Sequence, residues 1–257
     1  MADIFLCLTT LNLPIYLAWS DIRQRYRRST LGPFWITIST AVMIGCLGVI
    51  FGSLFKVPLK EFLPFLATGL ILWSYISTVL TEATSVFLSY ESIIKQLPIP
   101  LLTHVLRMVS RNFYILLHNL ILIPVILFIV NRPINWNLLY LIPDLILLTL
   151  NLTWMSLVIG IICTRFRDLG QIVINILQIF FYITPIIWMP NSLSERASIF
   201  ILEPNPFYHL LEIVRAPIMG VPPTLLNWSF SFLLALVGCF FSFYIYCNYK
   251  NRVVYWL

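Results

Sequence analysis

The chain has 257 residues, of which 60% are hydrophobic and only 10% charged, and its mean hydropathy is +0.92. Soluble domains carry about 25% charged residues, so this composition excludes a soluble globular protein and indicates an all-α polytopic membrane protein. The net charge of +6 is compatible with a nucleic-acid partner. A bias of cytoplasmic loops toward Lys and Arg explains the charge equally well, and we expect no nucleic-acid binding.

The first predicted element is an amphipathic helix that ends near residue 30. Its apolar stripe, at helical spacing, consists of Ile15, Trp19, Ile22 and Tyr26, with Ala18 on its flank. The opposite face carries Asp21, Arg23, Gln24, Arg27 and Arg28. A helix with these two faces lies in the membrane interface, with its arginines at the lipid headgroups. The following Leu31-Gly32-Pro33 ends it, because Gly permits a turn and Pro suits the first turn of the next helix.

Six later segments are long and apolar enough to be membrane spans, which need about 20 residues. They cover residues 34–55, 62–86, 113–130, 138–163, 171–188 and 225–247. With the N-terminus inside, eleven of the sixteen Lys and Arg residues fall on the cytoplasmic side and five on the other. The positive-inside bias therefore predicts that both termini are cytoplasmic.

The chain is thus predicted to form a single transmembrane domain over residues 1–257. Its parts are the interface helix and entrance loop (1–33), five spans (34–188), an external segment (189–224), and a sixth span with a cytoplasmic tail (225–257).

The cytoplasmic connection after the second span is stiffened by Pro98 and Pro100, which also end any preceding helix. A short helix capped by Ser89 or Ser92 and then a rigid Leu-Pro-Ile-Pro stretch would suit docking in a groove of a partner. A plain helix stop before the third span is the alternative.

The external segment is too apolar for an ordinary loop. Residues 199–202 and 207–215 are separated by Glu-Pro-Asn-Pro at 203–206, which predicts two short helices that meet at a sharp corner. Neither is long enough to span, and irregular backbone at membrane depth survives only when it is buried in protein or faces water. We expect a re-entrant helix pair between the fifth and sixth spans; an amphipathic hairpin on the outer surface is the alternative.

Sequence motifs for catalysis are absent. The chain has no G-x-x-x-x-G-K-[ST] phosphate loop, its three histidines are scattered, and its five cysteines form no C-x-x-C pair. We therefore expect no catalytic residue, no metal and no bound cofactor in this chain.

Ionisable residues within predicted spans are candidates for function. Glu82 lies near the inner end of the second span, and Arg107 and Arg111 precede the third at a similar depth. An antiparallel hairpin would allow them to pair, and coupling to protons is the alternative interpretation. Asp144, in the outer third of the fourth span, has no evident partner in the sequence.

Aromatic residues gather in the first and fifth spans, where Phe34, Trp35, Phe180, Phe181 and Tyr182 are candidates to stack on sugar rings. Interface belts and helix packing are the alternative explanations.

Residues 21–35, DIRQRYRRSTLGPFW, resemble the signature opening of the membrane subunit of ABC exporters for O-antigen, capsular polysaccharide and teichoic acid. Residues 164–169 (TRFRDL), 184–188 (TPIIW) and 205–207 (NPF) resemble later parts of the same family, in the same order. Glu212 and Arg215 also fit, whereas Ala216-Pro217 departs from the usual pattern.

The resemblance implies a permease subunit of the bacterial inner membrane that forms a homodimer and is driven by two copies of a cytoplasmic ABC ATPase. ATP and Mg would bind to that ATPase, not to this chain. The channel would be lined mainly by the first and fifth spans, and the substrate would be a polysaccharide linked to a polyprenyl-pyrophosphate carrier.

The resemblance also assigns roles along the chain. ATPase coupling falls on Lys95, Gln96, Leu97, Pro98, Ile99 and Pro100. The external gate falls on Pro204, Asn205, Pro206, Glu212 and Arg215. The cytoplasmic entrance falls on Leu31, Gly32 and Pro33, where Arg27 and Arg28 would attract the pyrophosphate.

Three alternatives remain at this stage. They are a self-sufficient flippase for lipids or lipid-linked sugars, a membrane-embedded transferase that uses His104 or His118, and an anchor for a cytosolic assembly that transports nothing. The missing chain of carboxylates weighs against the first, and the missing catalytic constellation against the second.

Overall fold

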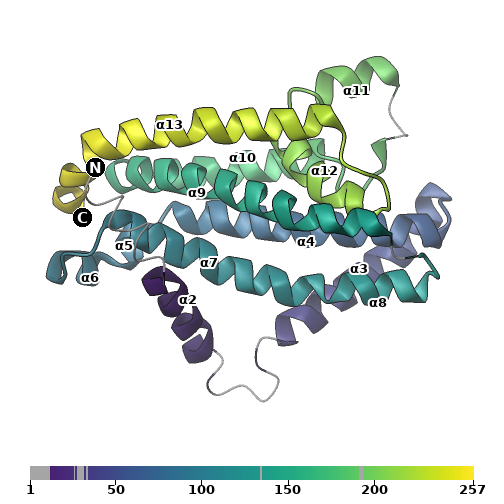
Figure 1. Cartoon of the computed structure of the whole chain (residues 1–257), viewed down its shortest axis with the longest axis horizontal. Coiled ribbons are helices and arrows are strands. Elements are labelled where there is room, and N and C mark those ends of the chain that lie inside the picture. The colour runs from purple at the N-terminus through teal and green to yellow at the C-terminus, as the bar shows by residue number, and fades with distance from the viewer. Residues whose placement is uncertain (1–11, 26, 28–31, 33, 134, 191–193) are drawn as a thin grey trace.

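The fold is a bundle of long helices, seen in a computed structural model that describes all residues except 1–11, 26, 28–31, 33, 134 and 191–193 (Figure 1). In chain order the described elements are α2 (Asn12–Arg25), α3 (Phe34–Phe55), α4 (Leu59–Ala83), α5 (Val86–Ser89), α6 (Glu91–Gln96), α7 (Leu101–Leu120), α8 (Leu122–Ile129), the 3-10 helix η1 (Trp136–Tyr140), α9 (Leu141–Arg165), α10 (Leu169–Ile183), α11 (Glu195–Ile201), α12 (Pro206–Ile218) and α13 (Leu225–Trp256). The described residues contain no strand, which agrees with the all-α prediction.

Five of the described helical stretches are long and apolar enough to cross a membrane, so the chain is a multi-pass membrane protein. They are α3, α4, α7 with α8, η1 with α9, and α13. The third begins at Leu101 and the last ends at Trp256, so both are longer than predicted. The near break between α7 and α8 follows from Pro124, whose ring conflicts with the carbonyl of Leu120, the last residue of α7.

The predicted count of six spans is not confirmed, because α10 has only 15 residues. A helix of that length rises about 22 Å, less than the roughly 30 Å hydrocarbon core. It ends at Ile183, and Thr184 has extended backbone angles, as expected of a residue before proline. The prediction of a helical span over 171–188 is therefore wrong in its last five residues, where the chain leaves the helix and the side chains of Thr184 and Ile186 are buried.

Helix α4 forms the centre of the bundle. In its most apolar 18-residue window 78% of the residues are buried, against 17% for α3 and 28% for α13. It packs against α7, α3 and α9 along its length and also contacts α12 and α10. The outer faces of α3 and α13 therefore remain available to lipid or to another protein.

The two ends of the bundle carry different short elements. One end, here called the α6 end, holds α5, α6 and the C-terminal part of α13 (Figure 1). At the opposite end, here called the α12 end, α11 and α12 follow one another around a corner at residues 202–205. The prediction of two short helices that meet at a corner is correct; that the pair is re-entrant stays a prediction.

Helices α9 and α13 form the most extensive contact between helices in the described part of the chain. A Cβ atom added at Gly238 of α13 would lie 2.0 Å from the ring of Trp154 on α9. Only glycine fits this position, which explains why α9 and α13 pack along much of their length.

Candidate functional site

Helix α2 lies transverse to the long helices and packs against α7 (Figure 1). Its buried residues are Pro14, Ala18 and Ile22, one turn apart. Ile15 and Trp19 of the predicted apolar stripe are each 44% exposed. The face that contacts α7 thus includes Ile22 of the predicted stripe and Ala18 on its flank. Trp19 also packs edge-on against Tyr114 of α7, at 5.5 Å between ring centroids, although it is partly exposed.

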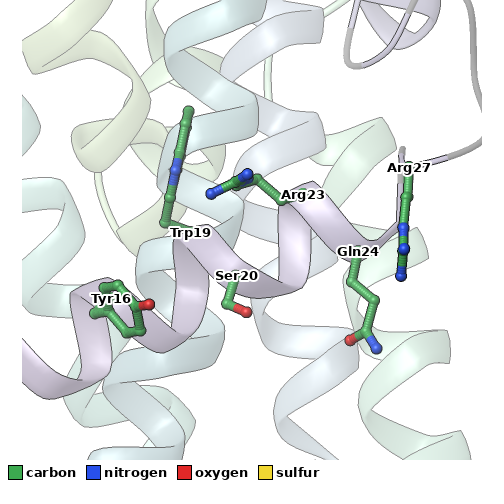
Figure 2. A pocket seen from close by; sticks show the side chains of 6 residues that line it. All are labelled: Tyr16, Trp19, Ser20, Arg23, Gln24 and Arg27. Carbon is green, nitrogen blue, oxygen red and sulfur yellow. The ribbon is translucent and has the colours of Figure 1, made fainter.

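The outward side of α2 forms a surface hollow of about 480 Å³ (Figure 2). It is lined by Tyr16, Trp19, Ser20, Arg23, Gln24 and Arg27. These residues form two i, i+4 rows, so aromatic and cationic side chains stand together on neighbouring turns. The lining contains no carboxylate, and the hollow therefore offers guanidinium donors to an anionic group. Arg27 is exposed here as predicted, whereas Arg28, Leu31 and Pro33 lie outside the described residues.

The polar side of α2 is fixed to the bundle by ion pairs. Arg107 Nε donates to Asp21 Oδ2 at 2.7 Å, and its Nη2 donates to Asp21 Oδ1, so the pair is bidentate. One turn further along α7, Arg111 Nη2 donates to Glu82 Oε2 at 2.6 Å. Asn112 Nδ2 donates to the same Glu82 oxygen at 2.6 Å. We call Asp21, Glu82, Arg107 and Arg111 the ion-pair network; it joins α2, α4 and α7.

The predicted pairing of Glu82 with an arginine of α7 is therefore correct for Arg111. Arg107 pairs with Asp21 instead. Sequence reasoning missed Asp21 because it lies 86 residues from Arg107. Its one signal was that Asp21 is the sole acidic residue in the arginine-rich segment. This arrangement explains Glu82 as a structural partner of arginine and leaves no need for coupling to protons.

Tyr90 connects the ion-pair network to the predicted docking segment. Its ring lies 4.6 Å from the guanidinium carbon of Arg107 on one side and stacks on His104 at 5.1 Å. Tyr90 immediately precedes α6. The prediction of a Ser89 or Ser92 cap is wrong, because Tyr90 occupies the cap position and no side chain caps the helix.

The docking segment, residues 95–100, lies at the α6 end. Lys95 lies in the last turn of α6 and donates to Glu91 at 2.6 Å, a hydrogen bond that lowers the pKa of Glu91. Leu97 is 51% exposed. Pro98, Ile99 and Pro100 share a small surface hollow with α13, and α7 begins at Leu101 without a break. A partner bound to the docking segment would therefore bear directly on both α7 and α13.

The aromatic candidates separate into two groups. Phe34, Trp35 and Tyr182 are 53%, 60% and 65% exposed, so their rings are available at the surface of α3 and α10. Phe180 and Phe181 are half-buried and pack edge-on or tilted against Phe207 and Trp73, at 4.9 and 5.9 Å between ring centroids.

At the α12 end, Asn205 fixes the start of α12. Its Oδ1 accepts hydrogen bonds from the N–H groups of Phe207 and Tyr208, and its Nδ2 donates to Thr184 Oγ1 at 2.9 Å. The first contacts are those of a helix N-cap with Pro206 in the first turn. The third joins α12 to the non-helical stretch after α10.

Arg215 of α12 is almost completely buried, at 1% exposure. It pairs with Glu212 one turn away at 3.5 Å and lies 4.0 Å above the ring of Phe65. A Cβ at Gly69 of α4 would come within 2.6 Å of Arg215 Nη2, so the glycine makes room for the guanidinium. Of the predicted gate residues, Asn205 and Arg215 are thus buried, Pro206 and Glu212 are partly buried and Pro204 is exposed, and Arg215 packs α12 against α4.

Several polar residues have structural partners that the sequence did not reveal. Trp228 Nε1 donates to Asp144 Oδ1 at 2.6 Å, which supplies the partner that Asp144 lacked. The ring nitrogens of His209 lie 2.8 Å from Asn227 Oδ1 and 2.7 Å from the Glu203 carbonyl oxygen. His104 and His118 have separate partners. His104 stacks on Tyr90, and a ring nitrogen of His118 lies 2.8 Å from the Tyr114 carbonyl oxygen.

These features define a multi-pass membrane domain: long apolar helices around the buried helix α4, a transverse helix α2 packed against α7, and a proline-containing segment before α7. The chain belongs to the ABC-2 type transporter family, whose pattern it matches over residues 15–219. The match extends from within α2 to the end of α12.

Among proteins with assigned names, the chain is 26% identical over 231 residues to an "O-antigen export system permease protein RfbA" of Klebsiella pneumoniae. The alignment covers 88% of this chain and 86% of that protein. It is 25% identical over 211 residues to the Myxococcus xanthus protein of the same name, covering 80% of this chain and 79% of the relative. The resemblance to permease subunits of polysaccharide exporters is thereby confirmed.

Proposed function

We propose that the chain is the channel-forming membrane subunit of an ATP-driven exporter. Its cargo would be a lipid-linked polysaccharide similar to O-antigen, moved from the cytoplasmic side across the bacterial inner membrane. The observation that carries this proposal is the similarity to O-antigen export permeases over nearly the full length of both chains. The chain itself would not hydrolyse ATP and would need an ATPase partner.

The partners would be a second copy of this chain and two copies of a cytoplasmic ABC ATPase. The docking segment supports the ATPase partner, since Leu97 is exposed and the stiff Pro98–Pro100 stretch leads directly into α7. The low burial of α3 supports a second copy, because only 17% of the residues in the apolar 18-residue window of α3 are buried, which leaves a face free for another copy. In this arrangement the termini, α6 and the C-terminal part of α13 are cytoplasmic.

The cargo path would begin at the outward side of α2. Arg23 and Arg27 would hold the pyrophosphate of a polyprenyl carrier, because each guanidinium forms paired hydrogen bonds with phosphate oxygens. Phe34, Trp35 and Tyr182 would contact sugar units along α3 and α10, with Phe180 and Phe181 supporting them from behind. The packed α12 unit would close the outer exit as a re-entrant gate.

Force from the ATPase would reach the cargo path through the ion-pair network. Closure of the ATPase on the docking segment would move α7, and Arg107 on α7 is joined to Asp21 of α2 by two hydrogen bonds. The helix that carries the cationic hollow would therefore move with the docking segment.

The proposal is tested by replacing the two prolines of the docking segment. Pro98→Ala/Pro100→Ala should reduce co-purification of the ATPase and lower polysaccharide export in cells, because a flexible segment loses its preorganised shape. Pro222→Ala/Pro223→Ala, at the opposite end of the bundle, is the matched control and should leave ATPase association unchanged.

Unchanged association and export in the docking variant would contradict the coupling assignment. Export of the cargo by the chain alone in proteoliposomes, driven by a proton gradient, would contradict the exporter proposal itself and favour a secondary flippase.

A further inference from the structure

A second surface hollow, of about 540 Å³, opens between α9 and α13 at the α6 end. Its lining includes Ile162 and Arg165 of α9 and Tyr244, Tyr249, Arg252 and Trp256 of α13. It is separate from the cationic hollow on α2 and from the docking segment. Nothing in the proposed transport cycle uses it.

The two arginines of this hollow are held by aromatic rings. The guanidinium carbon of Arg165 lies 5.0 Å from the ring centroid of Trp256 and 5.3 Å from that of Phe166. That of Arg252 lies 5.7 Å from Tyr249. A guanidinium that lies over a ring uses its flat face and keeps its N–H groups at the edge free to donate.

Neither arginine is neutralised. Within the described part of the chain Arg165 and Arg252 form no ion pair, whereas Arg107, Arg111 and Arg215 each pair with a carboxylate. The hollow has no carboxylate in its lining and therefore carries two unpaired positive charges. Two uncompensated cations beside each other favour an anionic occupant.

The remaining walls of the hollow suit hydrocarbon. Ile162 is 39% exposed and Tyr244 is 62% exposed, and both belong to membrane-spanning helices. Toward the helix ends the lining changes to Tyr249 and Trp256, the residue types that lie at the level of lipid headgroups. Cations at the headgroup level above an apolar wall match an amphiphile whose charge is at one end.

The hollow lies on a different face of α13 from the docking segment, so a partner at the docking segment would not fill it. Tyr246 and Lys250 point toward the docking segment and line the small hollow with Pro98 and Pro100. Tyr249, Arg252 and Trp256 follow one another at i, i+3 and i+7 on a different face. The last turns of α13 therefore present one face to the docking segment and another to the surrounding membrane.

We propose that the hollow between α9 and α13 is a binding site for an anionic phospholipid. Arg165 and Arg252 bind its phosphate oxygens, and its acyl chains lie along Ile162 and Tyr244. Two arginines match a lipid with two phosphates, such as cardiolipin, better than one with a single phosphate. The bound lipid bridges α9 and α13 at the α6 end.

The test uses the purified full-length chain in detergent, with cardiolipin as the probe. Native mass spectrometry counts the bound cardiolipin, and thermal unfolding is followed with added cardiolipin or with phosphatidylcholine of the same acyl chains. Arg165→Gln/Arg252→Gln should bind cardiolipin roughly thirtyfold more weakly, since each basic residue near a headgroup contributes about fivefold. Phosphatidylcholine should raise the unfolding temperature little in either protein.

Arg167→Gln is the matched control, because Arg167 is exposed two residues from Arg165 and does not line the hollow. It should bind cardiolipin as the unmodified chain does. Arg165→Lys/Arg252→Lys keeps the charge and loses the paired donors, and it covers the case in which the Gln variant does not fold; it should bind several-fold more weakly.

Three results would overturn the proposal. The first is cardiolipin binding that is unchanged in both double variants, and the second is equal weakening by Arg167→Gln, which would indicate charge attraction without a site. The third is that inorganic pyrophosphate at equal concentration raises the unfolding temperature as much as cardiolipin does, which would indicate a site for a soluble phosphate.

Discussion

Breaking the Asp21–Arg107 pair should release α2 from the bundle without unfolding the spans. Asp21 and Arg107 side chains are 15% and 14% exposed, so the pair lies between the exposed and the buried limit. Removing one partner costs about 0–1 kcal/mol in an exposed pair and about 3–5 kcal/mol in a buried one. We therefore expect Asp21→Asn or Arg107→Gln to destabilise the α2–α7 contact by about 2 kcal/mol, which is a roughly thirtyfold rise in the detached population.

Hydrogen–deuterium exchange of the α2 amides in the purified chain measures this population, because local opening sets the exchange of a segment held by few contacts. The double variant Asp21→Asn/Arg107→Gln should exchange little faster than either single variant, since either single change already breaks the bond between the two residues. Glu91→Gln is the control: it breaks a pair of similar length, 2.6 Å, whose side chains are 40–45% exposed, and should leave α2 unchanged.

Additive effects of the two single changes would refute the argument, as would single variants that exchange like the unmodified chain. Unchanged exchange in the single variants would mean that the apolar contact of Ala18 and Ile22 holds α2 without the ion pair. Acceleration across α4 and α9 in the single variants would instead mean that the pair stabilises the whole bundle.

Two further predictions concern packing and capping. Gly238→Leu should disrupt the α9–α13 contact at Trp154 by more than the 1–3 kcal/mol typical of overpacking and abolish the cooperative thermal transition, whereas Gly45→Leu, with open space at its Cβ, should not. Asn205→Ala removes the α12 cap and the bond to Thr184, and should lower stability by about 1–2 kcal/mol as measured by the unfolding temperature; Thr184→Val should reproduce only part of this loss.

The sequence predicted best where one local signal decides the structure. The bounds of α3 agree with the prediction, because a continuous apolar run lies between Pro33 and Lys56, and Lys56 adopts a positive φ of 54°. The corner before α12 was likewise marked by Pro204 and Pro206. Apolar content alone failed at α10, because it counts residues 184–188 as span although Pro185 turns the chain out of the helix.

What the sequence could not supply is the choice of partner between distant segments. By sequence position alone Arg107 could pair with Glu82 or with Asp21. Only the packing of α2 against α7 decides that it pairs with Asp21 and that Arg111 pairs with Glu82. The sequence also did not show which face of α2 makes this contact: Ala18 and Ile22 are buried, whereas Trp19 is 44% exposed.

Helix α4 connects the two ends of the molecule through specific contacts. Near the α6 end Glu82 holds Arg111 of α7, and thirteen residues earlier, about 20 Å along the helix, Gly69 accommodates Arg215 of α12. Helix α4 is the most buried of the five candidate spans, although a cavity of about 180 Å³ lies beside it between these points. A displacement of α7 by a partner at the docking segment would either break the Glu82–Arg111 pair or shift α4 against α12. Arg215 of α12 is buried against Gly69 of α4. A shift of α4 would therefore carry movement from the docking segment to the opposite end of the bundle.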